Sequence, residues 1–266
     1  MTQRPLLSVV IPVLNEASRL PLLLADLDRW SEPLEIHVID GGSHDATSLI
    51  GFLGGATVCT TPTPGRGQQL QVGSRLSPGR WLLVLHADSR LPSTWGETVA
   101  GIIQRPGSRN QAWYFDFQVD RPGPLLRFLE FAVFLRSAVL QRPYGDQGLL
   151  IHRERLAEVG GYRPLSLMED LDLVQRLSRS GRISRIGQPL ITSARRWRKR
   201  GVLSNAWCNL QLRRRWARGE DTAELARHYA AQAASSNTRT HSDVAAVPAP
   251  SPDADRNSRL PDQQTN

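Results

Sequence analysis

The chain of 266 residues has few cysteines and no long apolar run, and each of these scarcities argues against a class of protein; it also has only one lysine. Its two cysteines, Cys59 and Cys208, lie far apart and outside any metal-ligand spacing, which argues against a disulfide framework and a zinc site. No apolar run reaches the roughly 18 to 20 residues that a membrane-spanning helix needs. The N-terminus also lacks the basic-then-apolar order of a signal peptide. We therefore expect a cytoplasmic protein.

Since lysine occurs once, at Lys199, arginine carries almost all of the positive charge behind the formal net charge of +8. The excess is local, because residues 195–218 hold eight arginines and one lysine but no acid. Such a block is typical of a solvated cationic face, of a nucleic-acid-binding surface, or of peripheral contact with an anionic membrane, here at its inner face. The rest of the chain is nearly neutral, so nucleic acid is not the expected partner.

Apolar runs and helical periodicity alternate along the first 90 residues. The runs are β-branched, as in buried parallel strands, and leucines recur at helical spacing between them. The predicted strands are Leu6 to Val13, Leu34 to Ile39, Thr57 to Thr60 and Trp81 to Leu85, and helices begin near Pro21, Asp45 and Gly65. This alternation predicts an α/β fold with a Rossmann-like, doubly wound, mostly parallel sheet flanked by helices.

The second half of the chain is less regular, with predicted strands at Ala112 to Val119 and Leu149 to His152. A helix at Leu125 to Leu140 is apolar around most of its circumference, so we expect it in the core; a lipid-facing surface is the alternative. From about residue 231, Ser, Thr, Asn, Pro and Asp dominate without periodicity, which predicts a disordered tail. The expected organisation is one domain over residues 1–230, with C-terminal helices from about 202, followed by a tail over 231–266.

Polar residues follow three of the predicted strands: Asn15-Glu16, Asp40 and His86-Ala87-Asp88. Because ligands bind at the carboxyl ends of parallel strands, these residues predict one shared site. Asp40 precedes two glycines, where a carboxylate can accept hydrogen bonds from a ribose or base, or can cap the next helix. Asp88 has the oxygen chemistry to hold a hard divalent cation together with a nucleotide diphosphate, or it merely ends a strand.

Two further segments carry candidate chemistry. Glu169 and Asp170 open a helix, where its dipole stabilises acids by about 0.3 to 1 kcal/mol, so capping alone would explain them. An ionised Asp170 near an acceptor hydroxyl would be a general base. In the polar turn before the strand at Leu149, Asp146 and Gln147 can hydrogen-bond a sugar hydroxyl.

The basic block at residues 195–200 contains Trp197. Arginine makes bidentate phosphate contacts, and an aromatic ring beside it can stack on a base or sugar. A solvated cationic face explains such a run equally well.

Four of these segments together resemble the family 2 glycosyltransferases, which have the GT-A fold. They are residues 9–16 (VVIPVLNE), residues 38–47 (VIDGGSHDAT), His86-Ala87-Asp88 and Glu169-Asp170, and the likeness spans about residues 6 to 200. The resemblance implies a nucleotide-sugar donor. It places Pro12, Asn15 and Glu16 in the first donor loop and Asp40 at the nucleotide base.

The resemblance also implies roles for the later motifs. Asp88 corresponds to the final acid of the metal-binding D-x-D motif, which implies Mg²⁺ or Mn²⁺, and His86 replaces its usual first aspartate. Asp170 corresponds to the catalytic base of the E-D motif, with Glu169, Asp146 and Gln147 on the acceptor side. The remaining donor-side residues are Arg66, His86, Arg196 and Trp197. The segments 65–69 (GRGQQ) and 85–88 (LHAD) are similar to a bacterial branch described as radical-SAM/selenodomain-associated.

The implied reaction is an inverting displacement, in which Asp170 deprotonates an acceptor hydroxyl that attacks the anomeric carbon. One rival is a sugar-nucleotide pyrophosphorylase, but the first predicted strand lacks the glycine-rich phosphate loop of those enzymes. The other rival is a non-catalytic protein whose basic block binds nucleic acid or a membrane surface.

Overall fold

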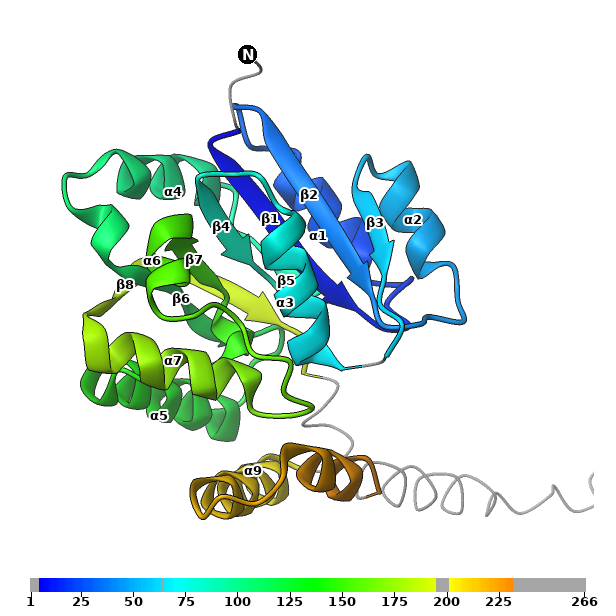
Figure 1. Ribbon diagram of the computed structural model, residues 1–266. Helices are drawn as coiled ribbons and strands as arrows, with labels where there is room; N and C mark the ends of the chain where they lie inside the picture. The colour runs from blue at the N-terminus through cyan, green and yellow to red at the C-terminus, as the bar shows by residue number, and fades with distance from the viewer. Residues whose placement is uncertain (1–4, 64, 195–200, 232–266) are drawn as a thin grey trace, which may run out of the picture.

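The computed structural model describes residues 5–63, 65–194 and 201–231. A mixed eight-stranded sheet has the strand order β3-β2-β1-β4-β7-β6-β8-β5. The strands are β1 (Leu7–Val13), β2 (Leu34–Asp40), β3 (Thr57–Thr60), β4 (Trp81–Val84), β5 (Ser89–Arg90), β6 (Ala112–Val119), β7 (Leu149–His152) and β8 (Ile183–Thr192). Strands β3, β2, β1 and β4 are parallel neighbours, as predicted, and their carboxyl ends meet at one edge (Figure 1).

The second half of the sheet departs from the parallel pattern. Strand β7 lies antiparallel between β4 and β6, and β5 pairs antiparallel with β8, whereas β6 and β8 are parallel. The prediction of an α/β fold with a mostly parallel sheet is confirmed. The antiparallel insertion carries the turn before β7 to the same edge as the loops after β1 and β2 (Figure 1).

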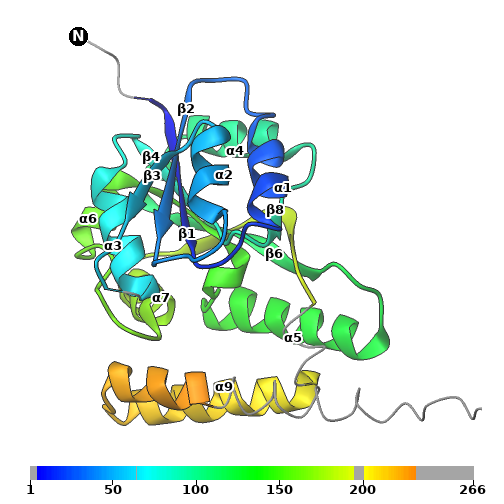
Figure 2. The ribbon, with the colours of Figure 1, turned by 90° about the vertical axis from the view of Figure 1, so that its right-hand side faces the viewer.

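Helices cover both faces of the sheet (Figure 2). They are α1 (Leu20–Leu27), α2 (Thr47–Leu53), α3 (Arg66–Leu76), α4 (Trp95–Gln104), α5 (Pro124–Leu140), α6 (Arg153–Glu158), α7 (Glu169–Ser180) and α9 (Val202–Ala217), with 3-10 turns η1 (Ser108–Asn110) and η2 (Gly145–Gln147). Alternate side chains of β1 enter different cores: Ile11 packs with α1 and α4, and Val10 packs with α3, α6 and α7. This two-residue alternation explains why the buried strands are apolar throughout.

Helix α5 does not lie in the core, so the expectation from its sequence is wrong. Only Val133 and Ser137 of its residues are buried, and much of its apolar surface faces outward. Together with α9 it lies at the end of the molecule beyond the carboxyl edge of β1 to β3 (Figures 1 and 2). Every helix in the described part of the chain is too short or too polar to span a bilayer.

Candidate functional site

The loop after β1 is hydrogen-bonded to the loop after β2. Asn15 has a left-handed backbone with φ of 54°, a conformation that asparagine tolerates better than most residues. Its N–H donates to Ser43 Oγ at 2.9 Å, and its Oδ1 accepts from the His44 N–H at 2.9 Å. The N–H of Glu16 donates to Thr47 Oγ1 at 2.8 Å. The two loops therefore form one platform at the carboxyl ends of adjacent strands.

Asp40 organises the second of these loops. It is buried, and its Oδ1 accepts from the N–H groups of Gly42 at 3.0 Å and Ser43 at 2.8 Å and from Ser43 Oγ at 2.7 Å. Ser48 donates to Oδ2. Burial alone would raise the pKa of Asp40, but the hydrogen bonds from Ser48, Ser43 and Gly42 outweigh it and hold the pKa below its ordinary value. Of the two interpretations of Asp40 from the sequence, contact with a ribose or base and capping, the observed hydrogen bonds are those of capping.

A buried glutamine joins the ends of β1 and β2. Gln69 Nε2 donates to the carbonyl oxygen of Val13 at 2.8 Å and to that of Ile39 at 2.6 Å, beside the half-buried Pro12. Gly67 lies two residues earlier, and a Cβ there would clash with the backbone of Arg163 and Leu165. The segment 65–69 therefore fixes α3 against both donor-side strands and the loop before α7.

Arg66 lies at the centre of a cluster of polar groups from four parts of the chain. Its guanidinium contacts His86 Nε2, and its Nε lies 3.3 Å from Glu169 Oε1. A Cβ on Gly145 would clash with Arg66 Nη2 and lie 3.0 Å from both His86 Nε2 and Asp170 Oδ2. The absence of a side chain at Gly145 lets Arg66, His86 and Asp170 come together.

The charged groups of this cluster shift one another's pKa values. Burial raises the pKa of Glu169, Arg66 opposes that rise and the Asp170 charge adds to it, so the pKa is above its ordinary value. Burial works against the charge on Arg66, but Glu169 and Asp170 overcome it and raise the pKa of the guanidinium. Arg66 is therefore a permanent cation between two carboxyl groups.

Asp170 is held by backbone donors from two directions. The N–H of Gly145 donates to its Oδ2 at 2.8 Å, and the N–H of Leu171 donates to its Oδ1 at 2.7 Å. Asp170 occupies the first turn of α7, where the helix dipole favours negative charge. Met168 precedes the helix with a left-handed φ of 66° and turns the chain into it.

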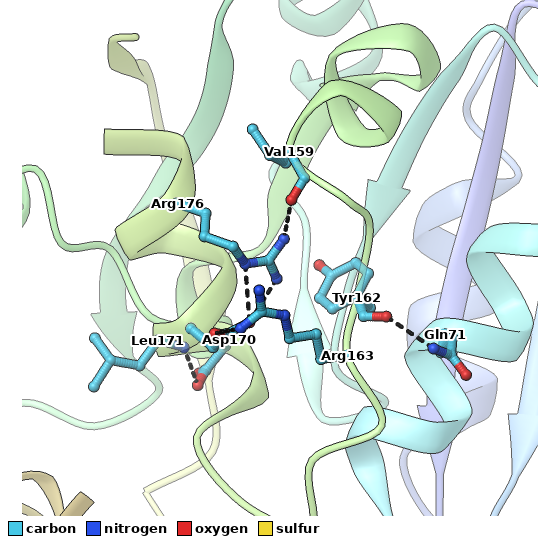
Figure 3. Close-up of polar contacts among 8 residues, drawn as sticks. Gln71, Val159, Tyr162, Arg163, Asp170, Leu171 and Arg176 are labelled. Carbon is cyan, nitrogen blue, oxygen red and sulfur yellow. Dashed lines mark hydrogen bonds and ion pairs between the residues drawn. The ribbon is translucent and has the colours of Figure 1, made fainter. Parts of the chain in front are cut away.

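Two arginines, Arg163 before helix α7 and Arg176 within it, bind Asp172 of the same helix (Figure 3). Arg163 Nη1 donates to Asp172 Oδ1 at 3.1 Å, and Arg176 Nη2 donates to Asp172 Oδ2 at 2.6 Å. Gln71 Nε2 donates to the carbonyl oxygen of Tyr162 at 3.2 Å, which ties the same loop to α3. Asp172 therefore has a structural role, two residues after Asp170.

A pocket of about 280 Å³ opens beside Asp170. Residues on one side come from the Arg66 cluster, η2 and the start of α7, and those on the other from α9. Its wall includes Arg66, His86, Asp146, Glu169, Asp170, Asn209, Leu212, Arg213 and Tyr229. Four predicted residues from separate segments, Arg66, His86, Asp146 and Glu169, thus share a pocket with Asp170.

Tyr144 joins α9 to the rest of the fold. The Arg136 guanidinium carbon lies 3.6 Å from the centre of the Tyr144 ring, and Arg213 of α9 lies 5.4 Å from it. Arg213 Nη1 also donates to the Tyr144 hydroxyl at 2.9 Å. These cation–π contacts hold the C-terminal helix over the pocket.

Gln147 faces the protein interior and does not line this pocket. It is buried; its Oε1 accepts from Ser137 Oγ at 2.8 Å and from Arg136 Nη2 at 3.0 Å, and its Nε2 donates to the Phe115 carbonyl at 3.2 Å. Gln147 therefore fixes η2 to α5 and β6, whereas its neighbour Asp146 lines the pocket.

Asp88 lines a second pocket, of about 220 Å³, with Arg19 and Asp120. Both acids adjoin Thr192 of β8, because Ser89 pairs with Thr192 on one side and the Asp120 N–H donates to the Thr192 carbonyl at 3.1 Å on the other. His86 and Asp88, which the D-x-D comparison groups together, thus line neighbouring pockets. Across the described ranges, no three or more His, Cys, Asp or Glu side chains form a group that could hold a metal ion.

Sequence reasoning did not identify Asp120, Arg19 or the bridging role of Gln69. Asp120 directly follows a correctly predicted strand, and that position is the same signal that singled out Asp40 and Asp88. The predicted donor contacts Arg196 and Trp197 lie outside the described residues.

Comparison with known proteins identifies a family and a fold. A family model described as glycosyl transferase family 2 matches residues 8–145, slightly more than half of the chain. Residues 1–349 of S. aureus TarS, solved with UDP-GlcNAc, are similar in structure, with a TM-score of 0.57 and 17% identity over 71% of this chain and 58% of that one. A Pyrobaculum calidifontis mannosyltransferase, PcManGT, solved with GDP-Man and Mn²⁺, gives 0.59 and 21% over 80% of this chain and 61% of that one.

Glucosyl-3-phosphoglycerate synthase from Mycobacterium tuberculosis, solved with Mn²⁺, UDP and glucosyl-3-phosphoglycerate, gives a TM-score of 0.53 and 20% identity over 76% of each chain. The chain spans less than two thirds of the length of the TarS and PcManGT chains. At these identities the likeness establishes a shared GT-A-type fold.

Proposed function

The chain belongs to glycosyl transferase family 2, and from that premise we propose that it transfers a sugar from a nucleoside diphosphate donor to an acceptor hydroxyl with inversion of configuration. One observation carries the proposal. A carboxylate, Asp170, lies in a pocket with the cation Arg66, and this pocket adjoins the turn that carries Asp88. A base and a phosphate-binding region beside one another are what an in-line displacement needs.

Asp170 is the proposed general base. Two N–H groups orient its carboxylate, and the helix dipole favours its charge. It takes the proton from an acceptor hydroxyl in the 280 Å³ pocket, and the hydroxyl oxygen then attacks the anomeric carbon from the face opposite the nucleotide. Glu169 and Asp146 line the same pocket and would bind other acceptor hydroxyls, whereas Gln147 acts by fixing η2.

The donor would lie against the loops after β1 and β2. Asn15, Glu16 and Asp40 belong to the hydrogen-bonded platform there, and we assign Asp40 to the nucleotide-base region through the loop that it orders. Arg66 and His86 would contact the diphosphate or the sugar from the other side. Arg196 and Trp197 remain proposed phosphate contacts on sequence grounds.

A divalent cation fits the pocket that contains Asp88. Asp88 and Asp120 supply two hard carboxylates, and Mg²⁺ commonly takes one or two carboxylates and completes its shell with substrate phosphate oxygens and water. Such a cation, Mg²⁺ or Mn²⁺, would offset the negative charge that develops on the leaving diphosphate. Arg19 lines the same pocket and would add a second positive charge.

Two finer assignments belong to the same proposal. Membership of the bacterial branch is proposed on the resemblance of its sequence motifs alone; in the structure Gly67 and Gln69 of segment 65–69 have packing and bridging contacts. The catalytic domain is proposed to run to about residue 230, because Asn209, Leu212 and Arg213 complete the pocket wall.

The test is calorimetric titration with UDP and GDP, each with and without Mn²⁺, on the wild type and on Asp88→Ala. Metal-dependent binding of one nucleotide that the variant loses would support the donor site and identify the nucleotide. The matching nucleotide sugars are then tested for transfer or slow hydrolysis. Failure of both nucleotides to bind, with or without Mn²⁺, would overturn the proposal.

A further inference from the structure

Helix α5 exposes a nearly continuous apolar surface. We define the α5 apolar face by its exposed large apolar residues, which are Leu125, Phe128, Phe131, Phe134, Leu135, Val139 and Leu140. Phe128 is 68% exposed and Val139 is 70% exposed. Arg127 is the single charged residue among the exposed positions of this helix. A contiguous apolar patch of this kind marks a surface that binds something.

The polar side chains of α5 point the other way. Glu130 accepts a hydrogen bond from the Val119 N–H at 2.9 Å, and Ser137 donates to the buried Gln147 at 2.8 Å. Arg136 also donates to Gln147, at 3.0 Å. These inward contacts fix the rotation of the helix, so that Phe128 and Phe131 face outward, whereas the ring of Phe134 contacts Arg185 of β8. The inner face of α5 is apolar as well, since Leu126, Leu129 and Val133 pack against β6, so the helix is apolar on both sides.

We infer that the α5 apolar face docks on the surface of an anionic lipid bilayer, with α5 lying in the plane of the interface. A helix held parallel to a membrane inserts apolar and aromatic side chains into the boundary between headgroups and acyl chains. Phe128 and Phe131 suit that position, and α5 needs no rearrangement because its rotation is already fixed.

The positive charge of the neighbouring helix α9 favours an anionic bilayer over the other possible occupants. Helix α9 lies beside α5 in both views (Figures 1 and 2). It contains Arg213, Arg214 and Arg215 and no acidic residue, and Arg214 and Arg218 are exposed at its C-terminal end. Cations next to an apolar helix are attracted to the negative surface potential of anionic lipids.

Two other occupants fit less well. A second copy of the chain would bring together two molecules of formal charge +8, each with the same arginine-bearing helix beside the patch. The chain's own residues 232–266 offer, apart from alanine and proline, only Val244, Val247 and Leu260 as apolar side chains. A second copy becomes an outcome of the test.

The test is co-sedimentation of the full chain with phosphatidylcholine vesicles, with and without phosphatidylglycerol. Wild type is expected to bind the anionic vesicles, and more weakly in high salt because the charges are screened. The double variant Phe128→Ser/Phe131→Ser should bind about tenfold more weakly or worse, since two aromatic side chains no longer insert. The matched control is Phe52→Ser/Leu53→Ser, which removes side chains 69% and 73% exposed on α2 and should bind as the wild type does.

A second variant tests the inference independently, in case the first variant misfolds. Arg214→Gln/Arg218→Gln changes two exposed residues and should weaken binding to anionic vesicles while leaving the melting temperature unchanged. The inference is overturned if wild type does not bind the anionic vesicles, or if the α5 and α2 variants bind equally. It is also overturned if light scattering shows a dimer that only the α5 variant abolishes and no vesicle binding accompanies it. The inference does not depend on the nucleotide titration, so either can fail alone.

Discussion

The backbone N–H of Gly145 donates a 2.8 Å hydrogen bond to Oδ2 of Asp170, across 25 positions of sequence. The same glycine leaves room for the guanidinium of Arg66. A turn before an antiparallel strand thus aims the proposed base and holds the neighbouring cation at once. This contact depends on no side chain at position 145, and it gives the first two predictions.

Replacing Asp170 with asparagine removes the proton acceptor but keeps the size of the side chain. We expect kcat to fall about 10²- to 10⁴-fold, the range for loss of a general base. Nucleotide affinity measured by calorimetry should not change. Asp28→Asn, an exposed carboxylate at the end of α1, is the control and should keep full turnover. Retained turnover in Asp170→Asn would remove this residue from the role.

Gly145→Ala should disrupt the cluster from its centre. The added Cβ would meet Arg66, His86 and Asp170 together, so the side chains must move apart and kcat should fall. The matched control is Gly101→Ala in α4, where a Cβ meets nothing within 4 Å. That control should keep its activity and gain about 0.5 to 1 kcal/mol of stability, as is usual for glycine in a helix. Equal activity of the two variants would contradict the proposed packing.

Gln69→Ala should destabilise the fold through the ends of two strands. It removes one hydrogen bond from each of the carbonyl oxygens of Val13 and Ile39, although Val13 keeps the bond from the Gly41 N–H, and a lost hydrogen bond of this kind costs about 0.5 to 1.5 kcal/mol. Urea denaturation measures the loss. Gln68→Ala, one residue earlier and half-buried, is the control and should lose less. If the two variants are equally stable, the bridge contributes nothing.

We expect Asp40 to make the free energy of unfolding decrease at acid pH. Its pKa in the folded protein lies below the ordinary 3.8, so the folded state binds this proton less readily than the unfolded state does. The resulting stability is fully present above the unfolded pKa and is lost as the pH falls from about 5 through the folded pKa. The unfolding free energy of Asp40→Asn, measured from neutral pH down to pH 3, should fall less steeply than that of the wild type. Parallel curves would show that Asp40 does not contribute.

The sequence predicted β1 and β4 well because these strands are buried on both faces and show their apolar runs directly. Strands β3 and β6 have the predicted bounds. The position of β7 between β4 and β6 was not predictable in the same way, since pairing direction is a tertiary choice that leaves no local pattern.

The candidate site was predictable where acids follow strands or open a helix, as for Asp88 and Asp170. The inward role of Gln147 was not, because it depends on Ser137 and Arg136 from a different helix. The orientation of α5 was also not predictable from the sequence, because a helix rich in apolar residues is normally buried. The contacts of Glu130 and Ser137 in the structure show which side faces the protein.

The pocket beside Asp170 is assembled from distant stretches of the gene. The platform of Asn15 and Asp40 lies within residues 8–145, the part that the family model matches, whereas Asp170 and the α9 wall at Arg213 lie beyond it. The residues of the proposed site are therefore encoded on both sides of residue 145. An exchange of the segment after residue 145 between related chains would replace the proposed base and the α9 wall of the pocket while leaving the platform of Asn15 and Asp40 of the parent intact.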